Sequence, residues 1–132
     1  MASQLYPFGK QALLTAQVNM ISDVIRAALI DTGTYTFNTA HQFFSSASGV
    51  VGTPTQLAGV TVNSPNPGVI DAADLTFLAV SGASIEALII YKDTGNPATA
   101  PLIAFIDGMT VVPQGGDIQI VWDNGPFRIF SL

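Results

Sequence analysis

The stretch EALIIYKDTGNPATAPLIAFIDG, Glu86 to Gly108, contains two apolar runs, ALIIY and LIAFI, on either side of a segment rich in turn-forming residues. Apolar and β-branched runs of about four to eight residues, bounded by Gly, Pro, Asn or Asp, are typical of β-strands. Asp93 and Gly95 favour a turn between the runs, because an Asp side chain accepts a backbone hydrogen bond and Gly readily adopts a positive φ. The stretch therefore predicts two strands separated by a turn-rich loop.

The same alternation of apolar runs and turn clusters continues on both sides of this stretch. The other strand-like segments are residues 24–30, 34–37, 57–62, 69–80, 117–123 and 127–132. About seven or eight short strands at a spacing of roughly 8 to 12 residues predict a mainly β fold, an antiparallel β-sandwich or barrel. Asn124-Gly125 is the strongest hairpin signal, and it predicts antiparallel pairing of the last two strands.

Helical patterns are confined to the N-terminal third of the chain. The apolar residues of QALLTAQVNMI, residues 11–21, recur at helical spacing and predict one short amphipathic helix. A second helical turn is expected to begin at Asn38 or Thr39, either of which suits an N-cap, and to carry Phe43 and Phe44. One or two short helices therefore accompany the predicted strands.

The composition indicates a single domain, residues 1–132, with a surface that is covered by other molecules. Charged residues make up only 10% of the chain and hydrophobic residues 48%, whereas an average domain has about a quarter of its residues charged. Such a chain suits burial against copies of itself or a larger partner, because obligate interfaces resemble domain cores.

Several classes of partner and site are disfavoured by the same residues. Four basic residues against nine acidic ones, with no Lys/Arg cluster, argue against nucleic acid. No apolar run reaches the roughly 18 to 20 residues of a transmembrane helix, and the N-terminus lacks a signal-peptide pattern, so we expect a soluble, unexported protein without a membrane partner. The absence of cysteine excludes disulfides and thiolate sites.

The tripeptide Asp-Thr-Gly, which forms the catalytic turn of aspartic proteases, occurs at Asp31 and again at Asp93. Two such carboxylates can share a proton and act as an acid and base pair. The copies are only 62 positions apart (93 minus 31), too close for two complete lobes, and Lys92 would place a cation beside the pair. A dimeric protease that uses Asp31 is a remote alternative. We expect both copies to be turns.

No other pattern predicts chemistry. The scattered Asp residues, Asp71 and Asp74 among them, do not form a calcium-loop motif, and His41 is the only histidine. No G-x-S-x-G motif or phosphate-binding glycine loop occurs. We therefore expect a non-enzymatic protein with no catalytic residues, metal or cofactor.

Aromatic residues outside the predicted β region are the candidate contact residues. Tyr6 and Phe8 precede the first helix, and Phe43 and Phe44 lie in the second helical turn. Because a small core has limited room for them, these four residues, together with Lys10 near the N-terminus, are the predicted interface residues.

The order and spacing of five segments resemble those of a small virion-associated protein type encoded by tailed bacteriophages: YPFGKQALL, DVIRAALIDTGTYTFNTAHQFF, VIDAADLTFLAVSGASIEALIIYKDTG, PLIAFID and VVPQGGDIQIVWDNGPFRIFSL. The resemblance covers nearly the whole chain. It implies a structural component of the particle, and we expect a capsid decoration or cement protein on the capsid exterior. Terminal segments of such proteins often reach neighbouring subunits, so residues 1–10 are expected to form an extended arm.

Two functional hypotheses follow from the resemblance and the composition. In the first, the chain binds the major capsid protein and copies of itself, as a homotrimer, and stabilises the shell through buried area. In the second, it is a tail or baseplate module that serves assembly or host binding. The position of the protein in purified particles separates the two.

Overall fold

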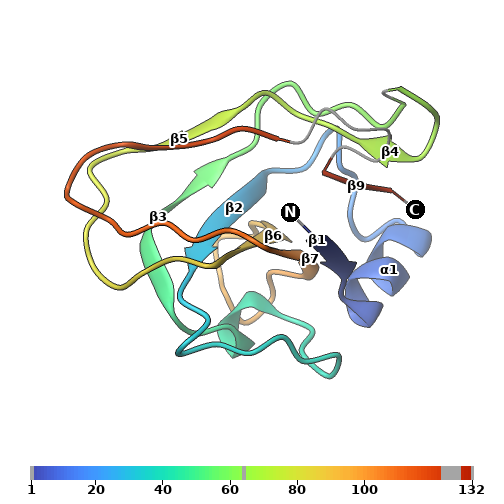
Figure 1. The fold of residues 1–132 in the computed structure, drawn as a ribbon. Coiled ribbons are helices and arrows are strands. Elements are labelled where there is room, and N and C mark those ends of the chain that lie inside the picture. The colour runs from blue at the N-terminus through green and yellow to red at the C-terminus, as the bar shows by residue number, and fades with distance from the viewer. Residues whose placement is uncertain (1, 64, 123–128, 132) are drawn as a thin grey trace.

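The computed structural model describes residues 2–63, 65–122 and 129–131 of the chain (Figure 1). The elements, in chain order, are β1 (Ala2–Leu5), α1 (Pro7–Leu14), β2 (Ile25–Ile30), the 3₁₀ turn η1 (Phe44–Ser46), β3 (Val50–Gln56), β4 (Val69–Ile70), β5 (Leu75–Phe77), β6 (Ala87–Lys92), β7 (Leu102–Asp107), β8 (Ile118–Ile120) and β9 (Phe130–Ser131). The predicted mainly β fold, with antiparallel sheets and a short helix in the N-terminal third, is confirmed.

The centre of the fold is a five-stranded antiparallel sheet in the order β1–β7–β6–β2–β3. Two short ribbons, β4 paired with β9 and β5 paired with β8, lie over one face of this sheet. The loop between β2 and β3, which contains η1, lies on the opposite side (Figure 1). The sheet is therefore covered on both faces, by different kinds of structure.

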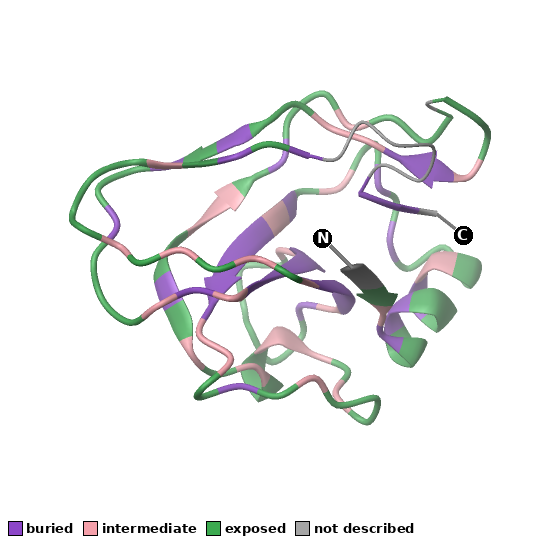
Figure 2. Ribbon diagram, viewed as in Figure 1, coloured by how far each residue is buried: buried purple, intermediate pink, exposed green. Residues whose placement is uncertain are grey.

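Burial on both faces explains why the central strands are apolar without alternation. Side chains of successive strand residues point to opposite faces, and every residue from Ala87 to Tyr91 is buried, as Figure 2 shows for the sheet. The ribbon-side cluster includes Ile25, Leu29, Ile70, Phe77, Leu88, Ile90 and Trp122. The loop-side cluster includes Tyr6, Ile30, Tyr35, Ile89, Tyr91, Leu102 and Phe105.

The N-terminal segment forms part of the central sheet. Residues Ala2–Leu5 pair with β7 as an edge strand, and Tyr6 donates its backbone N–H to the carbonyl oxygen of Ile103 at 3.0 Å. The expectation of an extended arm over residues 1–10 is therefore wrong for the described residues. Backbone pairing with β7 and the start of α1 account for nine of these ten positions.

The helix α1 packs closely against a β-bulge in β7. Ile90 pairs with Ala104 but Tyr91 pairs with Leu102, so Ile103 is an extra residue on its strand. Gly9 lies directly against it: a Cβ atom at Gly9 would be 2.5 Å from the carbonyl oxygen of Leu102 and 2.9 Å from the Cα of Ile103. Only a residue without a side chain lets α1 approach the strand so closely.

The helix begins four residues earlier than predicted and ends well before Ile21. Pro7 occupies the first helical position, where its fixed φ and missing N–H are tolerated. Ala16 has a positive φ of 61°, and the side chain of Asn19 accepts the N–H groups of Ile21 and Ser22, which organises a turn instead of a further helical turn. The apolar spacing alone therefore misplaces the helix.

Other boundaries also differ from the sequence prediction. Residues 34–37 form irregular chain that packs on the sheet, and residues 57–62 contribute only an isolated bridge between Thr61 and Asp71. Residues 50–56, which lie outside the predicted strands, form the edge strand β3, which accommodates Pro54 because an edge strand has one unpaired side. The second predicted helical turn is misplaced: the 3₁₀ turn η1 begins at Phe44 rather than after Asn38 or Thr39, and it has no side-chain cap.

The predicted pairing of the last two strands is wrong. Asn124-Gly125 lies outside the described residues, but β8 pairs with β5 and β9 pairs with β4. The two strands belong to separate ribbons. Their apolar residues bury against the same sheet face, so packing on the central sheet decides their partners rather than proximity in sequence.

Candidate functional site

The two Asp-Thr-Gly turns lie at opposite ends of the central sheet. β2 and β6 are antiparallel, with Ile25 opposite Lys92 and Ile30 opposite Ala87. Asp31 follows the end of β2 and Asp93 follows the end of β6, so the length of the strands, about 20 Å, separates them. A dyad of these two carboxylates within one chain is excluded.

Each Asp side chain organises its own turn. Asp31 accepts the backbone N–H of Gly33 at 2.9 Å and the hydroxyl of Thr34 at 3.1 Å. Asp93 accepts the N–H of Gly95 at 2.8 Å, and Arg26 donates from Nε to its other oxygen at 2.6 Å. The Gly95 N–H and then Arg26 hold the pKa of Asp93 below its usual value. Both copies have the geometry expected of structural turns.

The cation beside Asp93 is not the one that the sequence suggests. Lys92 points away from Asp93, forms an ion pair with Asp23 at 3.1 Å and donates to the carbonyl oxygen of Gln17 at 2.9 Å. Arg26 takes the position at Asp93. The Arg26 pair joins β2 to the turn after β6, and the contacts of Lys92 join β6 to the segment that follows α1.

Two further properties of the described residues bear on the site. No group of three or more His, Cys, Asp or Glu side chains among them is arranged to hold a metal ion. None of the helices in the described part of the chain is long and apolar enough to cross a membrane.

The five predicted interface residues do not share one environment. Tyr6 is fully buried in the loop-side cluster, so its assignment to an interface is wrong: its ring packs against that of Phe37, and its hydroxyl contacts that of Tyr35. Phe8 is 38% exposed and Lys10 is exposed on α1. Phe43 and Phe44 are half-buried, and the Phe44 ring stacks on Tyr91 with centroids 3.9 Å apart. Contact with a partner stays a prediction for the last four.

A chain of hydrogen bonds, buried at Tyr6 and partly buried at His41, links the loop to the sheet. The hydroxyl groups of Tyr6 and Tyr35 are 2.8 Å apart, and the Tyr35 hydroxyl is 2.8 Å from Nδ1 of His41. All three groups are satisfied when Tyr6 donates to Tyr35 and Tyr35 donates to a neutral His41 that carries its proton on Nε2. Burial raises the pKa of both phenols. The chain therefore has a structural use, which fixes the covering loop on the sheet.

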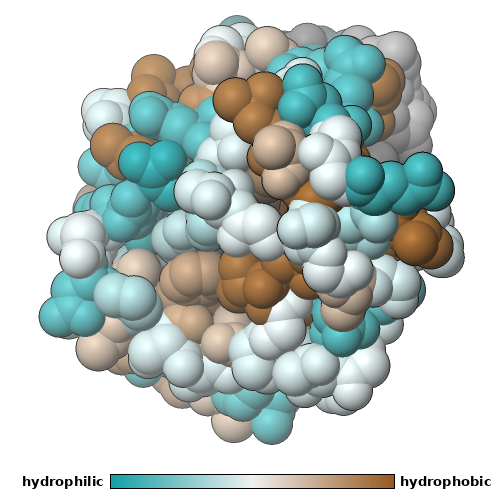
Figure 3. Space-filling model, turned by 90° about the vertical axis from the view of Figure 1, so that its left-hand side faces the viewer, coloured by the Kyte–Doolittle hydropathy of each residue, from teal (hydrophilic) through white to brown (hydrophobic). Residues whose placement is uncertain are grey.

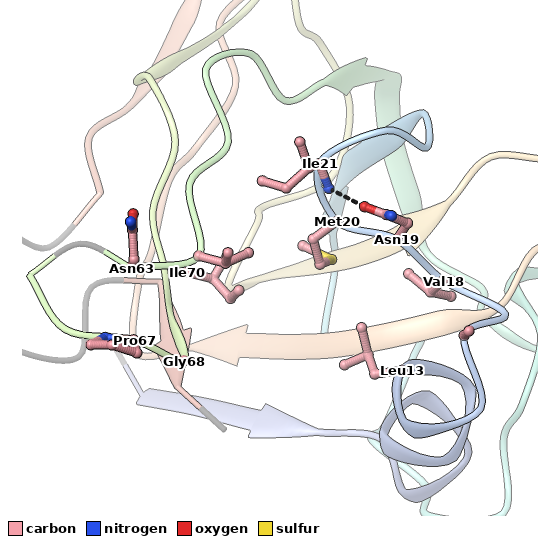
Figure 4. Close-up of a pocket in the computed structure, with 11 residues that line it drawn as sticks. Leu13, Val18, Asn19, Met20, Ile21, Asn63, Pro67, Gly68 and Ile70 are labelled. Atoms are coloured by element: carbon pink, nitrogen blue, oxygen red, sulfur yellow. Dashed lines mark hydrogen bonds between the residues drawn. The ribbon is translucent and has the colours of Figure 1, made fainter.

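An apolar groove is the candidate docking surface of the molecule. It lies between the end of α1 with the segment after it and the segment that leads into β4, and has a volume of about 650 Å³. Figure 4 shows Leu13, Val18 and Met20 on one side of the groove and Ile70 across from them.

The groove has a buried floor and an exposed apolar rim. Val18, Met20 and Ile70 are at most 5% exposed, whereas Ile21 and Val62 are 57% and 38% exposed. Asn19, which also lines the groove, is already engaged by the N–H groups of its own turn. Exposed apolar rims over an apolar floor are typical of surfaces that bind another protein.

Sequence patterns missed this groove. They place Met20 and Ile21 on a helix and Val62 in a strand, where apolar residues need no further explanation. One feature of the sequence could have indicated the groove: the apolar pair Met20-Ile21 stands directly before Ser22-Asp23, which favours a turn and therefore an exposed position.

No protein-family model matches the chain, and no curated protein is similar to it in sequence.

Proposed function

We propose that the chain is a non-enzymatic structural protein of a virion, a capsid decoration or cement protein of a tailed bacteriophage. In this proposal it binds the exterior of the major capsid protein lattice, as a homotrimer, and stabilises the shell through buried surface area. The observation that carries the proposal is the apolar groove with exposed Ile21 and Val62 on its rim, together with the sequence resemblance.

The low charge of the chain supports the proposal. Only 10% of the residues are charged, and further large apolar side chains are exposed away from the groove, including Leu78, Val112 and Val121. On the face viewed in Figure 3, apolar residues form separate areas between polar ones. Several separate apolar contacts suit a protein that meets more than one neighbouring subunit.

The use of the polar residues also supports a structural protein. The carboxylates of the two Asp-Thr-Gly turns accept hydrogen bonds within the turns, and the histidine completes a buried chain with two phenols. These groups hold the fold together, and their geometry offers no acid and base pair.

A density map of the purified particle tests the location. Density for this fold on the capsid exterior, at sites where capsid subunits meet, is the expected result. Density confined to the tail or baseplate would overturn the cement function in favour of the second hypothesis.

Variants of the rim test the surface. Ile21→Asp and Val62→Asp place charges on the groove rim, and each should reduce co-sedimentation with capsids that lack this protein by about tenfold or more, because burying an unpaired carboxylate is costly. Thr53→Asp is the control, since Thr53 is exposed, lies outside the groove and is not one of the exposed apolar residues. Equal losses for all three variants would contradict the groove as the docking surface.

A further inference from the structure

A second hollow lies on the loop side of the central sheet, where the end of β7 meets the segment after β2. Its volume is about 420 Å³. The rings of Tyr35, Phe37 and Phe105 form part of its wall, and the carboxylates of Glu86 and Asp107 are part of its lining. We call it the aromatic pocket.

The sheet register brings these groups together. Phe105 and Asp107 are two residues apart on β7, so their side chains share the loop-side face. The ring of Phe105 has its centroid 5.5 Å from that of Phe37 and 6.2 Å from that of Tyr35. The loop thus packs the rings of Tyr35 and Phe37 near that of Phe105, and the pocket beside them is also lined by carboxylates.

The carboxylates of the pocket have no basic partner in the described part of the chain. Glu86 accepts the backbone N–H and the hydroxyl of Thr32 on Oε1, at 3.0 Å each, and its carboxylate also accepts a hydrogen bond from the side chain of Ser84. Asp107 is half-buried, and no hydrogen bond or ion pair to its carboxylate occurs among the described residues. The ion pairs of Arg26 and Lys92 lie at the far end of β2 and β6.

The lining therefore combines negative charge with aromatic surface. It includes no Lys, Arg or His, and the described acidic residues are not arranged to hold a metal ion. An organic cation satisfies both features, because its charge faces the carboxylates while its flat or aliphatic part packs on the rings. Arginine fits best, since a planar guanidinium forms paired hydrogen bonds with carboxylates and stacks on aromatic faces.

We propose that the aromatic pocket binds an arginine side chain of a partner protein, with Asp107 and Glu86 facing the guanidinium and the rings of Phe37 and Phe105 packing on its stem. That the partner is a capsid subunit rests on the proposed function; the chemistry of the pocket does not. Arginine is also among the residues enriched in protein interfaces.

The pocket is tested by NMR with the full chain and a small probe. Acetyl-Gly-Arg-Gly-amide is titrated into labelled protein, and the amide signals of residues 32–37 and 105–109 should shift and saturate with a dissociation constant of about 1 mM. The same peptide with citrulline, a neutral isostere of arginine, should bind at least about tenfold more weakly. Equal binding of the two peptides, or no shift in either segment, would overturn the proposal.

Charge variants locate the site. Asp107→Asn and Glu86→Gln should each weaken binding of the arginine peptide by about two- to fivefold, the range expected for a partly exposed ion pair. The amide introduced by Glu86→Gln keeps an oxygen that can accept from Thr32. Asp117→Asn is the matched control: it removes one charge on the ribbon side, and its remaining oxygen still accepts the N–H of Ala79. An equal loss for Asp117→Asn would show a general charge effect and overturn the pocket.

The pocket and the proposed function fail separately. Peptide binding with the protein absent from the capsid map leaves the pocket and overturns the cement function. If the map places the protein on the capsid but the arginine peptide causes no NMR shifts, the cement function stands and the arginine-binding role of the pocket is overturned. Where both hold, Asp107→Asn should also weaken co-sedimentation with capsids, and Asp117→Asn should not.

Discussion

Both faces of the central sheet are apolar, but they are covered in different ways. On the ribbon side, paired strands from distant parts of the chain, β4 with β9 and β5 with β8, pack on Leu88 and Ile90. On the loop side, the segment between β2 and β3 covers Ile89 and Tyr91. The loop is held by the Asp31 turn, a stacked ring and the Tyr6–Tyr35–His41 chain.

This difference between the ribbon side and the loop side predicts which parts of the fold are locally more stable. Strand pairs that share a ladder of backbone hydrogen bonds open together. The loop is joined to the rest of the chain by side-chain contacts and by a few isolated backbone hydrogen bonds, such as Phe44 N–H to Ala100 and Leu102 N–H to Gln42, and should open by itself at lower cost. The ribbon side should therefore follow global unfolding, and the loop side should open first. The aromatic pocket lies on the side that adapts more easily.

The largest expected effect compares two neighbouring residues of β6. Leu88 and Ile89 are both fully buried and point to opposite faces. Substitution of either by Ala should cost about 2–5 kcal/mol of unfolding free energy. Leu88→Ala should lie near the upper end, because the paired ribbons cannot collapse into the cavity, and Ile89→Ala near the lower end. Urea unfolding measures both; a greater loss for Ile89→Ala would break the comparison.

The next effect concerns the buried phenols of the loop side. Tyr35→Phe removes the hydroxyl that the fully buried Tyr6 hydroxyl contacts, and should cost about 1–3 kcal/mol because Tyr6 then lacks a partner. Tyr6→Phe should cost only about 0.5–1.5 kcal/mol, since Tyr35 still reaches His41. Urea unfolding of the single and double variants checks the order. A larger loss for Tyr6→Phe would contradict the proposed direction of the chain.

A smaller effect concerns the turn that begins the loop. Asp31→Ala removes the acceptor for Gly33 and Thr34 and should cost about 0.5–1.5 kcal/mol. Hydrogen exchange should accelerate in residues 33–48 and stay nearly unchanged in β5 and β8. Uniform acceleration over both regions would show that the two sides of the sheet open as one unit.

The smallest effect is the pH dependence at the other Asp-Thr-Gly turn. The pKa of Asp93 is lowered in the folded chain, first by the Gly95 N–H and then by Arg26. Its contribution is therefore present above the unfolded pKa of about 3.9 and is lost as the pH falls through the folded value. For this partly exposed pair we expect at most about 1 kcal/mol. Between pH 6 and 2 the unfolding free energy should change less with pH in Asp93→Asn than in the parent chain. The same pH dependence in both proteins would contradict this contribution of Asp93.

Strand existence could be predicted from sequence where both faces of a strand are buried. β2, β6 and β7 are continuous apolar runs between turn residues, and periodicity finds them at once. β3 was missed because Gly52 and Pro54 have low strand propensity. Its strand state depends on pairing with β2, a contact between distant residues that no local pattern contains.

The candidate sites depend on distant contacts even more strongly. The turn function of Asp31 and Asp93 followed from local chemistry and was predictable. The backbone of Tyr6 bonds to Ile103, nearly a hundred positions away, and its buried ring packs on Phe37. The groove likewise needs Met20 beside Ile70. Sequence spacing contains neither proximity, so aromatic residues outside the strands were assigned to a surface that only some of them occupy.

The pairing of β1 with β7 also determines when the chain can complete its fold during synthesis. Ala2 pairs with Asp107, 105 positions later (107 minus 2), and α1 packs on the bulge of that same strand. A ribosome releases the first residues long before β7 exists, so the amino-terminal segment must wait without its partner. The packing of β1 and α1 is therefore completed only after β7 has been synthesised, and the dependence of the fold on distant pairings is typical of slower-folding small domains.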